Sequence, residues 1–195
     1  NLYTMKTEIV ADNKVLDTYE TEYGFRYFDF DNNTGFSLNG EKIKLKGVCL
    51  HHDQGALGAV ANRDAIERQV KILKEMGCNA IRVTHNPAAS VLLEVCNENG
   101  MLVINEAFDG WTEYKNGNVN DYTSHFNDVI STDNQIVNGK AGMKWGEFDV
   151  KAMVDGAKND PSVIMWSLGN DIDEGVSGNT SHYLNLVDDF IKWVQ

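Results

Sequence analysis

The sequence predicts an α/β fold built around a parallel sheet. From residue 43 onward, strand-like and helix-like segments alternate along the chain. The strand-like segments are apolar on both faces, as in sheets that helices cover. Alternation of this kind gives parallel strands joined by right-handed crossovers. Such units build either an open doubly wound sheet or a closed (β/α)8 barrel, and periodicity alone does not separate the two.

The first 30 residues differ from the rest and indicate the last strands of a β-domain. They are rich in Thr, Tyr, Phe and Val and alternate in strand fashion over 2–10 and 23–30, with a turn near Asp12-Asn13. Turn-forming residues at 31–35 indicate a boundary. The next stretch predicts a small hairpin that turns at Asn39-Gly40. We therefore expect one domain over 1–33 and a second over 34–195.

The α/β part is expected to begin with a strand over 43–50. Asn62 can cap a helix that runs to about Met76 and that Gly77 ends. One face of this helix is apolar and is formed by Ile66, Val70 and Leu73. A second strand is expected over 79–84.

The same alternation continues to the end of the chain. Ser90 is expected to cap a helix over 91–99, and Gly100 ends it. The remaining elements are a strand over 101–106, a long polar stretch over 110–145, a helix over 147–158 and a strand over 163–167. A final amphipathic helix carries Leu186, Val187, Phe190, Ile191 and Val194.

Composition excludes some classes of partner. The chain has 195 residues and a net charge of −12, whereas nucleic acid or an anionic membrane would require a basic patch. No apolar run is long enough to cross a bilayer. Three cysteines, Cys49, Cys78 and Cys96, show no metal-ligand spacing and are expected to be buried reduced thiols. They do not fix the compartment, which could be the cytoplasm or the cell surface and exterior.

Polar side chains follow each predicted parallel strand at its carboxyl end. The groups are His51, His52 and Asp53; Arg82, Thr84, His85 and Asn86; Asn105 and Glu106; and Asn170 and Asp171. In a (β/α)8 barrel, catalytic residues come from several strand ends at this face. Open sheets also bind ligands there, so the pattern predicts a site without deciding the architecture.

Each of these residues also has a structural interpretation. Asp53 could form a turn or accept a sugar hydroxyl, and His85 could be structural or donate to a substrate oxygen. Arg82 could be a buried cation that holds Glu106. Asn170 and Asp171 are ordinary turn formers. A metal site built from the histidines and Glu106 is disfavoured, because their spacing matches no common ligand motif.

Several stretches together resemble the bacterial β-galactosidases of glycoside hydrolase family 2. They are YGFRYFDFD, GFSLNGEKIKLKGVCLHHDQGALGA, GCNAIRVTHNP, LVINEAFDGW and NDPSVIMWSLGND, and they cover most of the chain in the family's order. The resemblance implies that residues 1–33 end an immunoglobulin-like β-sandwich. It implies that 34–195 form the N-terminal half of a (β/α)8 TIM barrel, with strands 1 to 4.

The resemblance also implies roles for individual residues in a retaining hydrolysis of terminal β-D-galactosyl groups. Asp171 stands at the acid/base position. Asp53, His85, Glu106 and Asn170 match positions that bind the sugar, and Arg82 matches a structural arginine beneath it. Retention requires two carboxyl groups about 5–5.5 Å apart. No cofactor is implied, and the partner is a carbohydrate.

The chain departs from the family pattern in three places. Asp replaces Glu at position 171, which withdraws the carboxyl group by roughly 1.5 Å. The nucleophile belongs after strand 7, outside this chain. Gly110 and Thr112 stand where magnesium-binding members have ligands, so we expect no metal there.

Other readings of function stay open. β-Glucuronidase and β-mannosidase are alternative activities within the family, and a catalytically impaired sugar-binding segment is an alternative of another functional class. The aromatic residues in 110–145 could form a platform for the leaving group or pack on one another; they are Trp111, Tyr114, Tyr122, His125, Phe126 and Trp145. Half a barrel leaves open strand edges, so we expect residues 1–195 alone to fold poorly or self-associate, or to require the missing half.

Overall fold

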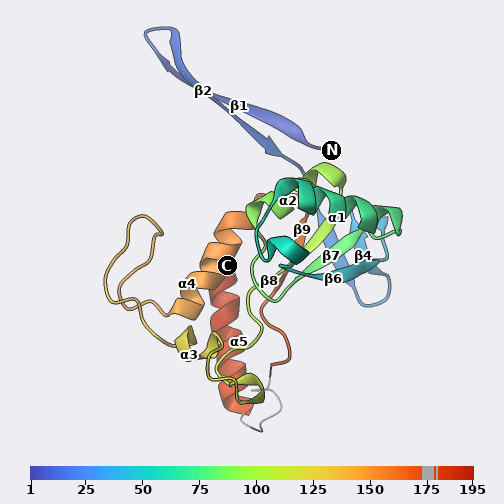
Figure 1. The fold of residues 1–195 in the computed structure, drawn as a ribbon. Helices are drawn as coiled ribbons and strands as arrows, with labels where there is room; N and C mark the ends of the chain where they lie inside the picture. The colour runs from blue at the N-terminus through green and yellow to red at the C-terminus, as the bar shows by residue number, and fades with distance from the viewer. Residues whose placement is uncertain (173–177, 179) are drawn as a thin grey trace.

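The computed structural model describes residues 1–172, 178 and 180–195 (Figure 1). Its centre is a parallel sheet whose strands lie side by side in chain order, β6-β7-β8-β9. These strands are β6 (Gly47–His51), β7 (Ala80–Thr84), β8 (Leu102–Glu106) and β9 (Val163–Ser167). A doubly wound sheet reverses its strand order at a switch point, whereas a barrel keeps it. The observed order is that of a barrel sector.

A helix joins each parallel strand to the next. These helices are α1 (Arg63–Glu75), α2 (Ser90–Asn99) and α4 (Trp145–Ala157), and α5 (Thr180–Val194) follows β9. Helix α1 begins as expected, because the Asn62 side chain accepts a hydrogen bond from the backbone N–H of Ala65 at 3.0 Å. Ser90 is not a cap, since it is already the first residue of α2 and Ala89 holds the cap position without a side-chain bond.

The two faces of the sheet have different environments. Ile81 and Val83 of β7 pack with side chains of α1 and α2 in the largest apolar cluster. Arg82 lies between them in the chain and therefore points to the opposite face. At the other end of the strands, Ala80, Leu102 and Ile164 pack against Phe36 and Leu38. The inner face of the sheet is thus closed at its amino end and carries its polar side chains at its carboxyl end.

A three-stranded antiparallel sheet supplies that closure. Its strands are β3 (Phe28–Asp31), β4 (Gly35–Leu38) and β5 (Glu41–Lys42), in the order β3-β4-β5. The turn at Asn39-Gly40 is present, with positive φ at both residues. The turn-rich stretch 31–35 joins β3 to β4 within this sheet. The expected division at residue 33 therefore falls inside a hairpin, and the division itself remains a prediction.

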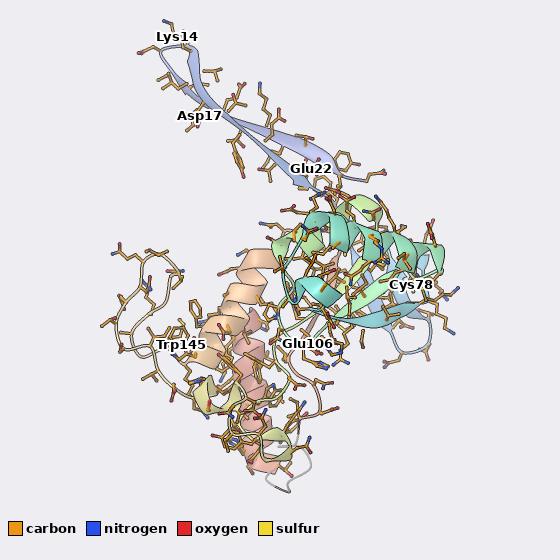
Figure 2. All side chains as sticks on the ribbon, viewed as in Figure 1. Lys14, Asp17, Glu22, Cys78, Glu106 and Trp145 are labelled. Carbon is orange, nitrogen blue, oxygen red and sulfur yellow. The ribbon has the colours of Figure 1, made fainter. Side chains whose placement is uncertain are left out.

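The N-terminal strands form a hairpin that stands away from the body of the molecule (Figures 1 and 2). Strand β1 (Tyr3–Ala11) pairs antiparallel with β2 (Lys14–Tyr23) around the expected turn at Asp12-Asn13. The stretch 23–30, expected to be strand, is strand only at its first residue and in its last part, where β3 begins at Phe28, and the expectation contained no strand over the rest of β2. Residues 14–23 mix Val15 and Leu16 with Thr, Tyr and charged side chains and form no continuous apolar face, so pairing with β1 across the turn holds them in a strand.

The long stretch 110–145 contains two short helices, η2 (Lys115–Gly117) and α3 (Thr123–Phe126), and a further short helix, η1 (Gly55–Leu57), follows β6. Among the described residues, no helix is long and apolar enough to cross a membrane. The three cysteines are free. Cys96 is buried, and burial raises the pKa of its thiol to about 12. Cys49 is exposed, contrary to expectation, because it lies on the inner face of the edge strand β6.

Candidate active site at the carboxyl ends of the strands

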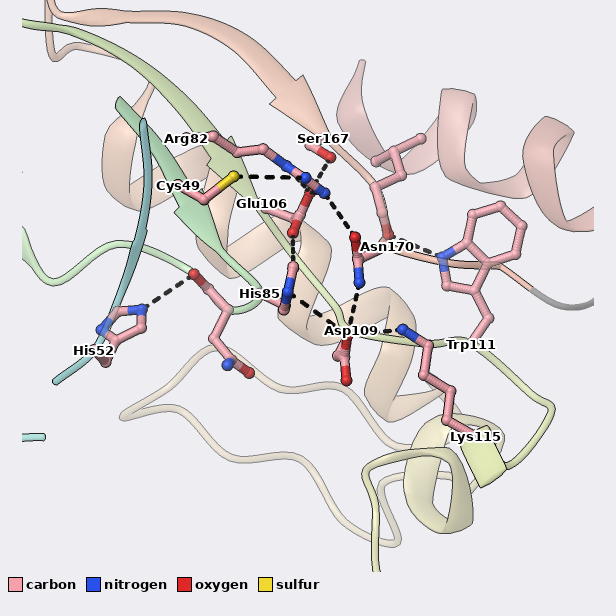
Figure 3. Close-up of polar contacts among 12 residues, drawn as sticks. Cys49, His52, Arg82, His85, Glu106, Asp109, Trp111, Lys115, Ser167 and Asn170 are labelled. Carbon is pink, nitrogen blue, oxygen red and sulfur yellow. Dashed lines mark hydrogen bonds and ion pairs between the residues drawn. The ribbon is translucent and has the colours of Figure 1, made fainter. Parts of the chain in front are cut away.

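Glu106 is the centre of a polar network at the carboxyl end of β8 (Figure 3). Its side chain is 0% exposed. Oε2 accepts hydrogen bonds from Nε of Arg82 at 2.8 Å and from Oγ of Ser167 at 2.5 Å. Oε1 accepts one from Nδ1 of His85 at 2.6 Å. A buried carboxylate is tolerated only when it is paired and hydrogen-bonded, and three different side chains meet that requirement here.

Arg82 connects this carboxylate to the end of β9. Its Nη2 lies 2.5 Å from Oε2 of Glu106 and also donates to Oδ1 of Asn170 at 3.1 Å. Burial lowers the pKa of Arg82, but the hydrogen bond and the charge of Glu106 outweigh it and leave that pKa above its ordinary value. The expected Arg82–Glu106 pair is therefore present, and it also fixes one end of the Asn170 amide.

The Glu106 bond also determines how His85 can act. Nδ1 faces a carboxylate oxygen, which only accepts, so the ring proton is on Nδ1 and Nε2 of the neutral ring is an acceptor. Nε2 lies 4.0 Å from Oδ1 of Asp109. The ring of His51 meets that of His85 edge-on, with centroids 5.2 Å apart. Neutral His85 can therefore accept a hydrogen bond from a ligand hydroxyl, and it donates from Nε2 only when protonated.

Asp109 and Lys115 extend the network along the loop after β8. Oδ1 of Asp109 accepts from Nζ of Lys115 at 2.7 Å and from Nδ2 of Asn170 at 3.1 Å. Partial burial raises the pKa of Asp109, but the bonds from Lys115 and Asn170 outweigh it and hold that pKa below its ordinary value. Sequence reasoning missed both residues. Asp109 follows so closely after Glu106 that the strand-end pattern could have included it.

Asp171 and Asp53 lie outside the network of hydrogen bonds. Asp171 is exposed, directly after Asn170, with φ of 44°, a left-handed conformation that Asp tolerates better than most residues. Asp53 is also exposed, and its Oδ1 accepts from the backbone N–H of Gly55 at 2.7 Å. Of the two interpretations of Asp53, the structure therefore shows the turn-forming one. Asp173 and Glu174, the carboxylates that follow in the sequence, lie outside the described residues.

Trp111 holds the segment that carries Asn170 and Asp171. Its Nε1 donates to the carbonyl of Leu168 at 2.8 Å, and its ring stacks on Tyr183 and meets Phe190 of α5. A Cβ at Gly169 would lie 2.7 Å from Nε1 of Trp111, which is too close for any other residue without a shift. The loop after β8 and helix α5 thus fix the turn after β9.

The other aromatic residues of the loop divide into two groups. Phe126 is fully buried and meets Phe108 edge-on, and Tyr122 stacks on Phe108, so these residues pack on one another. Tyr114 and Trp145 remain 44% and 38% exposed. His125 is also exposed. Within the described ranges, no group of three or more His, Cys, Asp or Glu side chains is placed to hold a metal ion.

Comparison with known proteins identifies the family that the chain resembles. The profile described as "Glycosyl hydrolases family 2, TIM barrel domain" matches residues 31–194. The chain is 42% identical over 185 residues to "Beta-galactosidase BoGH2A" of Bacteroides ovatus, which covers 95% of this chain and 20% of that protein. It is 37% identical over 177 residues to a "Putative beta-glucuronidase" of Formosa agariphila, covering 91% of this chain and 15% of that protein.

Solved structures give the same result for the fold. A glycosyl hydrolase family 2 member from Bacteroides cellulosilyticus superposes with a TM-score of 0.79 at 37% identity, over 100% of this chain and 23% of that one. A β-glycosidase from Bacteroides vulgatus gives a TM-score of 0.78 at 36% identity, over 98% of this chain and 22% of that one. The chain therefore spans about a fifth of the length of the relatives that it matches.

Proposed function

We propose that this chain, which belongs to glycosyl hydrolase family 2 through its TIM barrel domain, is the part of a retaining β-glycosidase that carries the acid/base residue. The observation that carries the proposal is the Glu106 network. It gathers side chains from three neighbouring strands at one end of the sheet and reaches Asn170, the neighbour of Asp171. We expect turnover to require a longer protein, since this chain spans about a fifth of the length of its relatives.

Asp171 is the proposed acid/base. It would protonate the glycosidic oxygen while a carboxylate from outside this chain attacks the sugar carbon, and it would then deprotonate the water that releases the sugar. Its exposure toward solvent is compatible with reaching a ligand. The short Asp side chain is the feature that favours the second candidate, a catalytically impaired sugar-binding protein. Asp171→Glu in the complete protein distinguishes the two: an enzyme turns over substrate and gains about tenfold or more in rate with Glu, whereas no turnover by either form favours the sugar-binding protein.

Asn170 and His85 are the proposed sugar-binding groups. Asn170 donates one amide proton of Nδ2 to Asp109, which leaves its second proton for a sugar hydroxyl oxygen. Nε2 of His85 can accept from another hydroxyl. Glu106 and Arg82 act mainly on each other and hold these two residues in place. Asp53 is proposed as a further sugar contact, for which its bond to Gly55 leaves Oδ2 available.

The proposed sugar is uncharged, and β-galactosides are the preferred substrates. A glucuronide would require a cation for its carboxylate. In the part of the network that the structure describes, Arg82 is paired with Glu106 and Lys115 with Asp109. The loop 51–59 also resembles galactosidases most. The test compares nitrophenyl β-galactoside with nitrophenyl β-glucuronide on the complete protein, and faster turnover of the glucuronide would refute this choice.

Further parts of the protein are proposed to cover the open edges of this chain. The β1–β2 hairpin exposes Tyr3, Ile9 and Leu16, and an isolated two-stranded hairpin is marginally stable in water. An immunoglobulin-like β-sandwich would cover it. Strands β6 and β9 end the described parallel sheet, so the second half of the barrel would pair there. Without these parts, the chain would self-associate.

A further inference from the structure

The side-chain amide of Asn170 is held at both ends by groups of opposite charge (Figure 3). Its Oδ1 accepts a hydrogen bond from Nη2 of Arg82 at 3.1 Å, and its Nδ2 donates one to Oδ1 of Asp109 at 3.1 Å. A guanidinium only donates, and an ionised carboxylate only accepts. If the amide were turned by half a rotation, Nδ2 would face the guanidinium and Oδ1 would face the carboxylate. Only one orientation of the amide therefore satisfies both neighbours.

Arg82 fixes only the oxygen end of this amide. The guanidinium is itself held by Glu106, whose Oε2 accepts from Nη2 at 2.5 Å. An amide bonded only at its oxygen can still turn about that bond, and its protons would then point in several directions. The second bond, from Nδ2 of Asn170 to Asp109, removes this freedom. The proton of Nδ2 that Asp109 does not accept therefore keeps one direction.

Lys115 fixes Asp109 in turn. The side chain of Asp109 is 58% exposed, and an exposed carboxylate without a partner takes up several rotamers. Nζ of Lys115 donates to its Oδ1 at 2.7 Å, from a side chain that is only 19% exposed. Partial burial raises the pKa of Asp109, but the bonds from Lys115 and Asn170 outweigh it and keep that pKa below its ordinary value. Asp109 is therefore an ionised acceptor at neutral pH, and Lys115 sets its position.

The loop after β8 thus holds the turn after β9 at two separate points. Trp111 binds the backbone through the carbonyl of Leu168, whereas Asp109 binds the side chain of Asn170. The two contacts are independent, because one ends on a main-chain oxygen and the other on an amide nitrogen. Loss of the Asp109 carboxylate should therefore leave the backbone of the turn in place and release only the amide.

The other proposed sugar-binding group is not held by Asp109. Nε2 of His85 lies 4.0 Å from Oδ1 of Asp109, which is too long for a hydrogen bond. We propose that Asp109, held by Lys115, is a positioning residue that acts on a sugar ligand only through Asn170. This inference rests on the proposed role of Asn170 in sugar binding.

The test is a double-mutant cycle in the complete protein, with nitrophenyl β-galactoside as the substrate. Asp109→Ala should lower kcat/KM about tenfold, because the charge-assisted bond to Asn170 is lost. In an Asn170→Ala background the same change should cost less than about twofold, since no amide is left to position. Asp128→Ala is the matched control, because Asp128 is an exposed carboxylate of the same loop whose ion pair with His125 lies outside the network. It should change kcat/KM in neither background. Equal losses from Asp109→Ala in the two backgrounds, or no loss, would overturn the inference.

Conservative variants separate positioning from a general effect on folding. Asp109→Asn keeps an oxygen that can accept from Nδ2 of Asn170, so it should recover kcat/KM to within about threefold of wild type. Lys115→Met removes the cation that holds Asp109 and should lower kcat/KM only while Asn170 is present. Lys115→Arg should recover most of that loss. If Asp109→Asn is as slow as Asp109→Ala, the bond to Asn170 is not what Asp109 contributes.

A binding measurement distinguishes failure of the inference from failure of the proposed function. Isothermal titration with isopropyl 1-thio-β-galactoside, which resists hydrolysis, should give a Kd about tenfold weaker for Asp109→Ala, with no further weakening when Asn170→Ala is already present. That result supports the positioning role even if the complete protein hydrolyses no glycoside, which would refute only the proposed function. An unchanged Kd, weakening that persists in the Asn170→Ala background, or no binding by wild type overturns the inference even if galactosides are hydrolysed.

Discussion

The indole N–H of Trp111 donates a hydrogen bond to the carbonyl of Leu168 at 2.8 Å, which ties the loop after β8 to the turn after β9. Trp111→Phe keeps an aromatic ring and removes the donor. Loss of one hydrogen bond to this partly buried carbonyl costs about 1 kcal/mol, and the turn that carries Asn170 and Asp171 would lose its anchor. We expect a lower Tm and a fall in kcat of about tenfold for the complete protein, with KM changed less.

The control for this variant is Trp145→Phe, because Trp145 is half-exposed and lies outside the Leu168 contact. It should leave kcat within twofold. A kcat for Trp111→Phe that equals that of the control would show that the hydrogen bond does not position the turn.

Gly169 is expected to tolerate no larger side chain. A Cβ there would lie 2.5 Å from Cδ1 of Ile172 and 2.7 Å from Nε1 of Trp111, so Gly169→Ala must move both side chains or the backbone between them. A displacement of about 1 Å near reacting groups can reduce the rate about 10²-fold. We expect a loss of that order in kcat. Gly110→Ala is the matched control, since its Cβ would meet no atom closer than 3.7 Å. Similar rates for the two variants would contradict the tight fit.

Glu106→Gln tests the buried charge pair. The substitution leaves the Arg82 guanidinium beside a neutral amide, and breaking a buried pair on one side costs on the order of 3 kcal/mol. The expected result is a clear loss of stability in urea unfolding of the complete protein. Glu94→Gln provides the comparison, because the Arg63–Glu94 pair is on the surface. If the two variants unfold at the same urea concentration, the Glu106 network does not stabilise the site.

Asp160 is expected to make stability depend on pH. Burial raises the pKa of its carboxyl group, and the nearby charge of Glu94 acts in the same direction, although the 2.6 Å bond from Asn97 opposes them. A group whose pKa is higher in the folded state destabilises the fold once it ionises. The Tm of Asp160→Asn relative to wild type should therefore rise as pH increases from about 4 through the raised pKa, and then level off. A Tm difference that falls with pH would contradict the assignment.

The regular elements could be predicted because local pattern and packing agree in them. The apolar face of α1, its Asn62 cap and the apolar strands β7 and β8 all appear where the sequence indicates. Strand β2 could not be placed, because its neighbours Val15 and Leu16 point to opposite faces and its other residues form no continuous apolar face. The order of the strands in the parallel sheet could be determined only from the structure, since alternation of strands and helices fits both a barrel and an open sheet.

The candidate site was predictable only as far as strand ends define it. Parallel strands bring their carboxyl ends together, which grouped Arg82, His85, Glu106 and Asn170 in advance. Trp111 and Lys115 lie on a loop whose path depends on packing against α5, far along the chain. Local pattern carries no information on such contacts. What Asp53 and Asp171 contribute to binding or catalysis likewise depends on their contacts with a ligand, which the fold alone does not determine.

The central claim is that Asp171 is the acid/base of a retaining mechanism, and azide rescue tests it most directly. Asp171→Ala in the complete protein removes the general base for the second step, so a glycosyl-enzyme formed from dinitrophenyl β-galactoside should persist. Azide needs no base, and its attack should restore turnover and yield the β-galactosyl azide. Turnover of Asp171→Ala that matches wild type without azide, or an α-configured azide product, would contradict the account.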